Sequence, residues 1–204
     1  MIVATPLDLP IIEPDDWSVF WKIWNMYAKP LIKTYNNHKG SYAKIGDTSI
    51  WKGIDIHKKN LWHVAWQAPY YDVREELPKM YQMIESCSPF VITDRVRIIE
   101  SLQNITSHTD DNFDQWNVRA ILRCTDKNPQ WVFTRPGTTK NALFFQLPES
   151  TNWFAYNDKH CWHGSIYNPE HPKLLIQLYG AIFKNKELLT NSIEKYKEYT
   201  ISYD

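Results

Sequence analysis

The feature that most constrains this chain is a change of hydrophobic period near residue 90. From there on, apolar residues occur in short or alternating runs, which are typical of β-strands. The runs cover residues 90–92, 95–102, 105–108, 118–124, 131–134, 142–146, 152–156 and 174–183. Turn-forming sequences such as Pro136-Gly137 and Asn168-Pro169 separate several of them. Short strands in this number, divided by turns, predict a sandwich or a barrel.

Helical spacing dominates the part of the chain that precedes these strands. Asp15 and Asp16 can cap a helix whose apolar residues, from Trp17 to Tyr27, recur with a helical period until Pro30 ends it. A Trp-rich stretch follows, and its alternation indicates further strands. The chain therefore begins with a mixed helical and extended part.

Two more helices are expected. One covers residues 72–87, where Asp72 and Glu75 have the spacing of a capping box and Pro78 makes the first turn irregular. The other covers residues 186–199. Helices first and strands later predict an α+β protein whose catalytic part is a jelly roll of the cupin kind.

The length of 204 residues fits a single domain. We expect a mixed amino-terminal part over 1–89, a β core over 90–183 and a carboxy-terminal helix within 184–204. No basic n-region opens the chain, and no apolar run is long enough to cross a bilayer. A soluble, cytoplasmic protein is expected.

The charge balance bears on possible partners, and the cysteine content bears on the redox compartment. Lys and Arg together number 23, as do Asp and Glu, and no basic stripe for nucleic acid is present. The three cysteines Cys87, Cys124 and Cys161 are far apart and form no CxxC pair. They are expected to be buried structural thiols in a reducing compartment.

One short segment carries the residues with the clearest chemical meaning. His108 and Asp110 are two residues apart, and on a strand such residues point to the same side of the sheet. An imidazole and a carboxylate held together are two corners of the two-His-one-carboxylate triad of non-haem iron sites. His163 is the candidate for the third corner, because the intervening strands can bring the chain back alongside.

This arrangement resembles the Fe(II)/2-oxoglutarate-dependent oxygenases, a superfamily with an HxD…H motif on a double-stranded β-helix. The resemblance covers residues 95–180. It implies Fe(II) bound by His108, Asp110 and His163, with 2-oxoglutarate and O2 as cosubstrates. In that superfamily a basic residue beyond the second His binds the distal carboxylate of 2-oxoglutarate, and Lys173 stands at the matching position.

Two branches of the superfamily share further features with this chain. The HTDD sequence, then Arg119, then a Trp-rich stretch ending in HGSIYN resemble the aspartyl/asparaginyl β-hydroxylases. That likeness implies that Arg119 is a second anion contact. Lys173, where most members have Arg, resembles the prolyl-4-hydroxylase-like members. Gln103-Asn104 stands in place of the Pro-Gly turn often seen before the HxD strand.

Several neighbouring residues compete with this assignment. Only His163 is followed by small residues and by a basic residue at the family's spacing, which favours it over His160. Asp111 is expected to cap a turn or to face solvent. Arg119 and Arg123 alternate with apolar residues, and their shared face is either the inside of the barrel or solvent.

The implied activity is hydroxylation of an amino-acid, peptidyl or other small substrate, with succinate and CO2 as co-products. Two alternatives stay open. One is a non-catalytic cupin-like module whose aromatic residues bind a ligand, and the other is a zinc hydrolase that uses the same triad. The sequence does not identify the substrate.

Overall fold

The computed structural model describes residues 1–35, 44, 46–58, 68–109, 116–123, 131–138, 141–170, 173–183 and 185–204. Within these ranges the chain forms three helices and twelve strands. The helices are α1 (Trp17–Tyr27), α2 (Pro78–Cys87) and α3 (Lys186–Lys195). The strands are β1 (Ile2–Pro6), β2 (Lys29–Thr34), β3 (Thr48–Lys58), β4 (Phe90–Ser101), β5 (Ile105–His108), β6 (Trp116–Arg123), β7 (Trp131–Thr134), β8 (Leu143–Phe145), β9 (Trp153–Asn157), β10 (Trp162–Ser165), β11 (Leu174–Phe183) and β12 (Ile201–Ser202).

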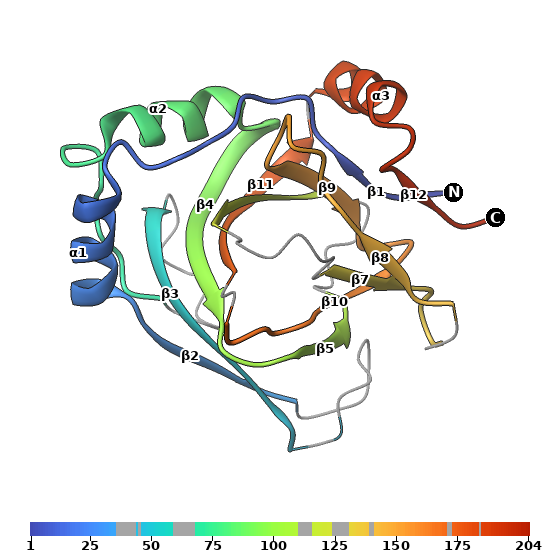
Figure 1. Cartoon of the computed structure of the whole chain (residues 1–204), viewed down its shortest axis with the longest axis horizontal. Coiled ribbons are helices and arrows are strands. Elements are labelled where there is room, and N and C mark those ends of the chain that lie inside the picture. The colour runs from blue at the N-terminus through green and yellow to red at the C-terminus, as the bar shows by residue number, and fades with distance from the viewer. Residues whose placement is uncertain are drawn as a thin grey trace.

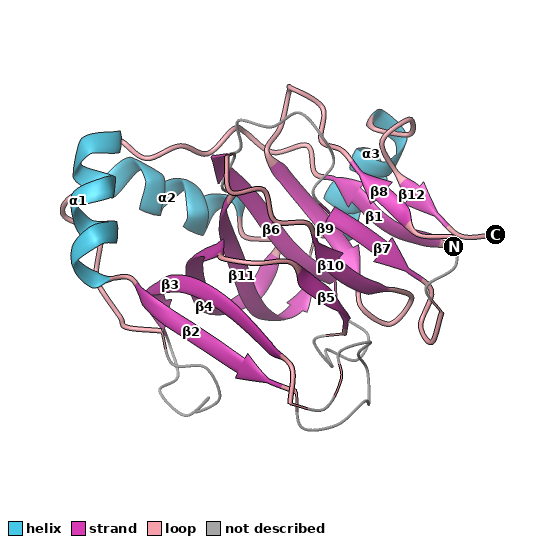
Figure 2. Ribbon diagram, turned by 60° about the horizontal axis from the view of Figure 1, so that its bottom comes forward, coloured by secondary structure: helices cyan, strands magenta, loops and turns pink. Residues whose placement is uncertain are grey.

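The strands form two sheets (Figures 1 and 2). The large sheet has the order β12-β1-β9-β6-β11-β4-β3-β2, and the small sheet has the order β5-β10-β7-β8. Every pairing between these described strands is antiparallel. The predicted α+β class is therefore confirmed at the level of antiparallel sheets with three helices in the described ranges.

The chain passes back and forth between the two sheets from β4 onward. Strands β4, β6, β9 and β11 belong to the large sheet, whereas β5, β7, β8 and β10 belong to the small one. β3 and β2 extend the large sheet on one side, and β1 and β12 extend it on the other. The ends of the chain lie side by side, because the main-chain oxygen of Met1 accepts from the Tyr203 amide (Figure 1).

The outer face of the large sheet packs against α1 and α2, which lie along it in Figure 1. Its core is apolar, and on the central strands it consists of Val96, Ile98, Val118, Ala120, Leu174, Ile176 and Leu178. Ile23 and Trp24 from α1 and Met80 and Ile84 from α2 cover these residues. The alternation of the strands places their other residues on the inner face.

The inner face of the large sheet packs against the small sheet. Its apolar part contains Ile99 and Leu175, together with Phe133 of β7 and Phe154 of β9. Both sheets thus contribute to a second core, separate from the one beneath the helices. The predicted site residues His108, Arg119, His163 and Lys173 lie beside this inner core.

The amino-terminal helix forms as predicted. The Asp16 carboxylate accepts hydrogen bonds from the amides of Ser18 and Val19 and so caps α1. These bonds, together with the one from the Ser18 hydroxyl, lower the pKa of Asp16. The helix ends at Tyr27, and Pro30 lies in β2, an edge strand where its missing N–H group is tolerated.

The second helix differs from the expectation. It begins at Pro78 rather than near Asp72, and its N-cap Leu77 makes no side-chain capping bond. Asp72 instead pairs with Arg74, which lowers the pKa of Asp72 to about 2. The amides of Lys79 and Met80 donate to Asp15, a residue far away in the sequence. The predicted capping box was therefore wrong, and a long-range cap replaces it.

Smaller departures concern the end of α3 and four strands. α3 ends at Lys195, before the predicted end at 199, and β1, β2, β10 and β12 were not among the predicted strand runs.

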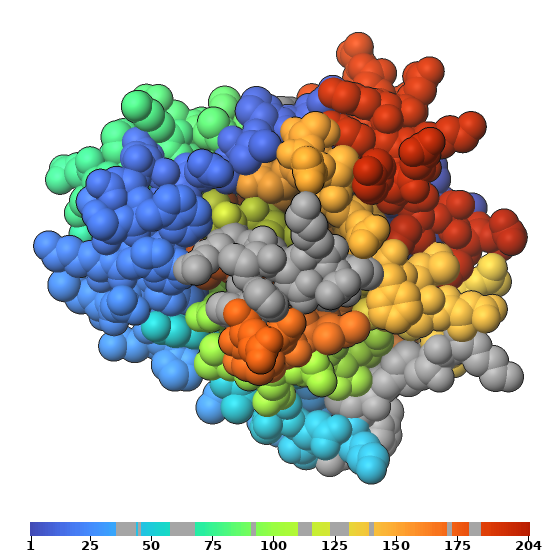
Figure 3. Space-filling model, in the orientation of Figure 1, coloured from blue at the N-terminus to red at the C-terminus, as the bar shows by residue number. Residues whose placement is uncertain are grey.

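In Figure 3 the loop after β10 (orange) lies against the segment before β5 (lime green), where the Tyr167 amide donates to Asn104. No helix in the described ranges has both the length and the apolar character required to cross a membrane.

Candidate metal centre

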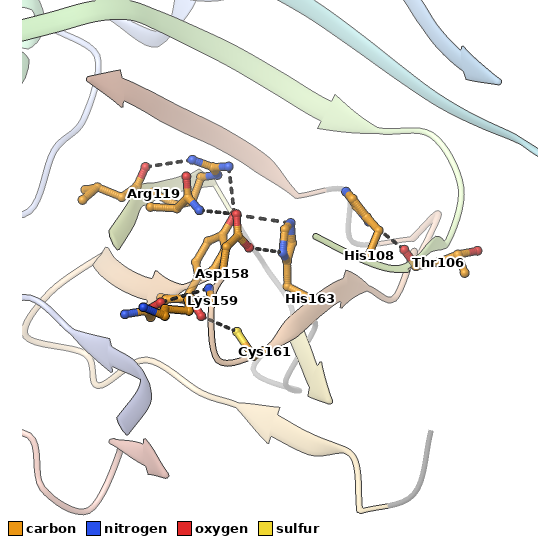
Figure 4. A network of polar contacts seen from close by, with 11 residues as sticks. Thr106, His108, Arg119, Asp158, Lys159, Cys161 and His163 are labelled. Atoms are coloured by element: carbon orange, nitrogen blue, oxygen red, sulfur yellow. Dashed lines mark hydrogen bonds and ion pairs between the residues drawn. The ribbon is translucent and has the colours of Figure 1, made fainter. Parts of the chain in front are cut away.

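Two histidines face each other across neighbouring strands of the small sheet. His108 ends β5 and His163 lies in β10, and the antiparallel register pairs the two residues directly. Their ring centroids are 4.6 Å apart. Both residues are buried, with 5% of His108 and 4% of His163 exposed. Figure 4 shows the two side chains. Two residues distant in the sequence, both predicted as metal ligands, are therefore brought together.

The hydrogen bonds of the two rings determine which nitrogen each can offer to a ligand. The Nδ1 atom of His108 lies 2.8 Å from the carbonyl oxygen of Thr106, and a carbonyl can only accept. The Nδ1 atom of His163 lies 3.0 Å from Oδ1 of Asp158, and an ionised carboxylate also only accepts. In the neutral imidazole the proton is therefore on Nδ1 and the lone pair is on Nε2. This is the state in which a histidine binds a metal through Nε2.

Asp158 is held from a second side. Its Oδ2 atom accepts a hydrogen bond of 2.6 Å from Nδ2 of Asn117, on β6 of the large sheet. Asp158 is buried, with 4% of the residue exposed. It lies in the turn between β9 and β10 (Figure 4). The sequence did not single out Asp158, because a lone acidic residue in a turn has no periodic signal.

Tyr156 and Arg119 extend this network into the large sheet. The Tyr156 hydroxyl lies 3.3 Å from Nε2 of His163, and Nη2 of Arg119 donates to that hydroxyl at 2.9 Å. Arg119 is 1% exposed, and its guanidinium also lies 5.4 Å from the ring of Tyr179. The face of Arg119, which the sequence left open, is thus the inside of the molecule. The side chain of Arg123 lies outside the described residues.

Lys173 is a buried cation on the same side of the small sheet. Its ammonium donates to the hydroxyl of Ser165 at 2.9 Å and lies 4.6 Å from the ring of Trp131. Ser165 follows His163 by two residues on β10, so both side chains point to one face of the strand. Lys173 is only 4% exposed, although the sequence places it at the start of a strand next to a turn. The structure therefore brings Lys173 close to the strand that carries His163.

Of the remaining candidate site residues, the structure describes His160 but neither Asp110 nor Asp111. His160 lies in the turn before β10, and its amide donates to the carbonyl of Asn157. Asp110, the predicted carboxylate ligand, and Asp111 lie outside the described residues. The described ranges alone contain no group of three His, Cys, Asp or Glu side chains that could hold a metal ion. Two imidazoles of the predicted triad are therefore described, without its carboxylate.

The cysteines near the site are buried thiols. Cys161 donates from Sγ to the carbonyl of Asn157 at 3.1 Å, and burial raises its pKa. Burial also raises the pKa of Cys87, beneath the helices. Both cysteines are free, as expected, and both are protonated at neutral pH because a raised pKa disfavours the thiolate. Cys124 lies outside the described residues.

Comparisons with known proteins find only distant likenesses. No protein-family model and no curated protein sequence match the chain. An oxidoreductase of the 2OG-Fe(II) oxygenase family from Burkholderia pseudomallei is similar with a TM-score of 0.49 and 11% identity, over 82% of this chain and 81% of that one. OsALKBH1 is similar with a TM-score of 0.38 and 9% identity, over 72% of this chain and 83% of that one. IDO from Bacillus thuringiensis is similar with a TM-score of 0.35 and 11% identity, over 76% of this chain and 74% of that one. The chemistry of the site has to be inferred from its own residues.

Proposed function

We propose that this chain is a mononuclear non-haem iron oxygenase that uses 2-oxoglutarate and O2. The observation that carries the proposal is the pair His108 and His163, which face each other on β5 and β10 with both Nδ1 atoms hydrogen-bonded to acceptors. Their Nε2 atoms supply two of the three protein ligands of a facial ferrous site. The donor set fits Fe(II), because imidazole nitrogen is a ligand that this ion accepts.

Asp110 is the proposed third ligand. The assignment comes from the sequence, in which Asp110 follows His108, the last residue of β5, by two residues. A carboxylate adds negative charge, which balances part of the charge of a divalent ion. Three ligands on one face leave positions open for a chelating cosubstrate and for O2.

We propose Lys173 as the residue that binds the distal carboxylate of 2-oxoglutarate. The support is its burial and its contact with Ser165, two residues beyond His163 on β10. A buried ammonium carries a desolvation cost, which the negative charge of a carboxylate can offset. Arg119, which bonds to the Tyr156 hydroxyl beside His163, is the proposed second anion contact.

When bound, the iron would allow O2 to act as the oxidant, with one oxygen atom passing to the substrate as a hydroxyl group and the other to 2-oxoglutarate, which would be oxidised to succinate and CO2. The chain binds and orients both groups and keeps water away from them. Three buried aromatic side chains line the site and exclude water from it, namely those of Trp131, Phe133 and Phe154. The proposed substrate is an amino acid, a peptidyl side chain or another small molecule, and the aspartyl/asparaginyl and prolyl-4-hydroxylase-like activities are the branches to test first.

The strands β4 to β11 are the proposed double-stranded β-helix. The support is their alternation between the sheets, in which β9-β6-β11-β4 form the centre of one and β5-β10-β7-β8 form the other. This alternation of antiparallel strands supports a jelly-roll arrangement. The two histidines lie on neighbouring strands of the smaller sheet, at the side that faces the larger one.

An anaerobic titration tests the proposed function. Fe(II) followed by 2-oxoglutarate should produce a weak visible charge-transfer band, and candidate substrates should then cause succinate release in air. Peptides with Asp, Asn and Pro residues and the free amino acids are the first candidates. A zinc hydrolase would bind metal without any response to 2-oxoglutarate, and a binding module would respond to neither, so either outcome would refute the oxygenase.

A further inference from the structure

The two proposed metal ligands differ in what holds their second nitrogen. A neutral main-chain carbonyl, that of Thr106, accepts from His108, whereas a buried carboxylate, that of Asp158, accepts from His163. We propose that Asp158 is a positioning residue that fixes the tautomer and the ring orientation of His163 and strengthens its binding to the metal. This inference rests on the proposed function only at the level of the metal site.

The surroundings of Asp158 hold its carboxylate in one place. Oδ1 lies 3.0 Å from Nδ1 of His163, and Oδ2 lies 2.6 Å from the amide nitrogen of Asn117. The two partners come from different sheets, since His163 is in β10 and Asn117 is in β6. Both oxygens are therefore engaged, and rotation of the carboxylate would break at least one bond. Asp158, which lies in the β9–β10 turn, is therefore hydrogen-bonded to a residue of each sheet.

Burial makes the pairing strong. Side-chain exposure is 5% for His163 and 1% for Asp158, so water does not screen the interaction between them. A buried carboxylate without hydrogen-bond donors would be costly, and Asn117 and His163 supply these donors. The Asn117 contact also leaves the Nδ1 proton of His163 as the natural partner of Oδ1. The pair is thus arranged to keep Nε2 as the atom that carries the lone pair.

The consequence for a bound metal follows from general chemistry. A carboxylate hydrogen-bonded to the far nitrogen of a ligating imidazole increases the basicity of the ligand and fixes its orientation. Loss of such a partner typically weakens metal binding about 10–100-fold. A neutral carbonyl partner contributes less charge, so the distal ligand of this site should depend on its partner more than His108 does.

A purely structural reading of the same contacts is an ion pair that holds the β9–β10 turn. That reading predicts a loss of folding stability when Asp158 is changed, with an unaltered metal site in the molecules that remain folded. The two readings differ in the metal affinity and in the spectrum of the bound metal, both measured on folded protein.

Co(II) is a suitable probe, because its visible absorption reports the ligand field of the site. Asp158→Asn keeps the size of the side chain and an acceptor oxygen but removes the charge. We expect its Kd for Co(II) to rise about 10–100-fold and the Co(II) absorption bands to shift. Asn117→Ala, which loosens Asp158 without removing its charge, should change both quantities in the same direction and by less. It also provides a test if Asp158→Asn does not fold.

Asp55→Asn is the matched control. Asp55 is also a buried carboxylate on the large sheet, but its partner is Arg97, with Nε 2.6 Å from Oδ1. Its loss should lower the stability in a denaturant titration and leave the Co(II) affinity of the folded protein unchanged. Asp158→Asn and Asn117→Ala variants that fold and bind Co(II) like the parent would overturn the inference and leave the proposed function standing. A parent chain that binds no Co(II) would refute both.

Discussion

The two faces of the large sheet have opposite characters. On β11, Ile176 points outward into the apolar core beneath α1 and α2, whereas its neighbour Gln177 points inward toward the small sheet. On β4, Ile98 and Arg97 differ in the same way. The outer core beneath the helices is built from apolar side chains, and the inner face combines apolar residues with buried charges.

This difference separates the work of stabilising the protein from that of binding ligands. Apolar burial contributes favourably to folding with no polar group to satisfy. Buried charges cost desolvation that a partner must offset, and Arg97 has such a partner in Asp55. The proposed site lies on this inner side, so we expect that the outer face can be changed without an effect on the site.

The largest expected effect comes from removing a metal ligand on the inner side. His108→Ala and His163→Ala should each lose detectable Fe(II) binding at micromolar metal, because each removes one of the three proposed protein ligands. The fold should persist, since the apolar cores do not include either ring. Anaerobic metal titration together with circular dichroism of each variant measures both quantities.

Two neighbouring substitutions define the site more narrowly. Asp110→Ala should lose Fe(II) like the histidine variants. His160→Ala should bind nearly normally, because His160 lies in the turn before β10 and not in the strand. Retention of metal by His163→Ala and its loss by His160→Ala would show that the distal ligand is misassigned.

The second effect concerns the buried cation. Lys173→Ala should weaken 2-oxoglutarate binding by about two to three orders of magnitude or more, because a broken buried charge pair typically costs about 3–5 kcal/mol. Iron binding should barely change, since the lysine is not a proposed ligand. Anaerobic titration of the iron-loaded variant with 2-oxoglutarate measures the loss.

The matched control keeps the charge. Lys173→Arg should retain part of the affinity, because the guanidinium is cationic but differs in length and shape. If Lys173→Ala bound 2-oxoglutarate as the parent does, Lys173 would be excluded as the anchor. Arg119 would then be the next residue to test, because it is buried and bonds to the Tyr156 hydroxyl beside His163.

The sequence predicted those elements that depend on local signals. α1 follows from the Asp16 cap and the helical period, and the strands at 105–108, 131–134 and 174–183 have the predicted bounds, because turn residues delimit them. β10 was not among the predicted runs, because its sequence WHGS contains a single large apolar residue. The capping box at Asp72 failed because Pro78 fixed the start of α2 and Asp15 supplied the cap.

The site was predictable to the extent that its residues belong to a motif. His108 and His163 could be paired from their order along the chain, and the structure brings them together. Asp158 could not be found, because its bond to His163 depends on the conformation of the β9–β10 turn and on Asn117 from another sheet. The side of Arg119 was undecidable because an alternating strand gives the same pattern for a polar interior and for solvent.

The third effect tests the outer face. Ile176→Ala should lower the free energy of unfolding by about 2–5 kcal/mol, because it leaves a cavity in the core beneath the helices. The affinities of the folded protein for Fe(II) and 2-oxoglutarate should stay unchanged. Gln177→Ala is the inner-face partner. It removes the acceptor of the Tyr179 hydroxyl and should cost about 1 kcal/mol.

Denaturant unfolding and metal titration of these two variants test whether the outer face of the large sheet determines stability and the inner face determines binding. An Ile176→Ala variant that unfolds like the parent would mean that the outer core is not the main source of stability. A change in metal affinity larger in Ile176→Ala than in Gln177→Ala would show that the two faces are coupled.

The smallest effect distinguishes the two buried thiols, Cys87 beneath the helices and Cys161 beside the small sheet. Burial raises the pKa of both above the ordinary value of 9.0, so in alkaline solution the unfolded chain loses these protons first. Their contribution to stability is therefore complete below pH 9.0 and is lost as the pH rises above it. Cys161 is completely buried and Cys87 is 9% exposed, so Cys161 should contribute more to the pH dependence of stability.

Cys161→Ser keeps a donor toward the carbonyl of Asn157 but does not titrate. The stability of this variant should therefore fall less than that of the parent between neutral and alkaline pH. Cys87→Ser should show a smaller difference in the same denaturant titrations, and equal alkaline slopes for the parent and Cys161→Ser would contradict the buried, neutral thiol on the inner side.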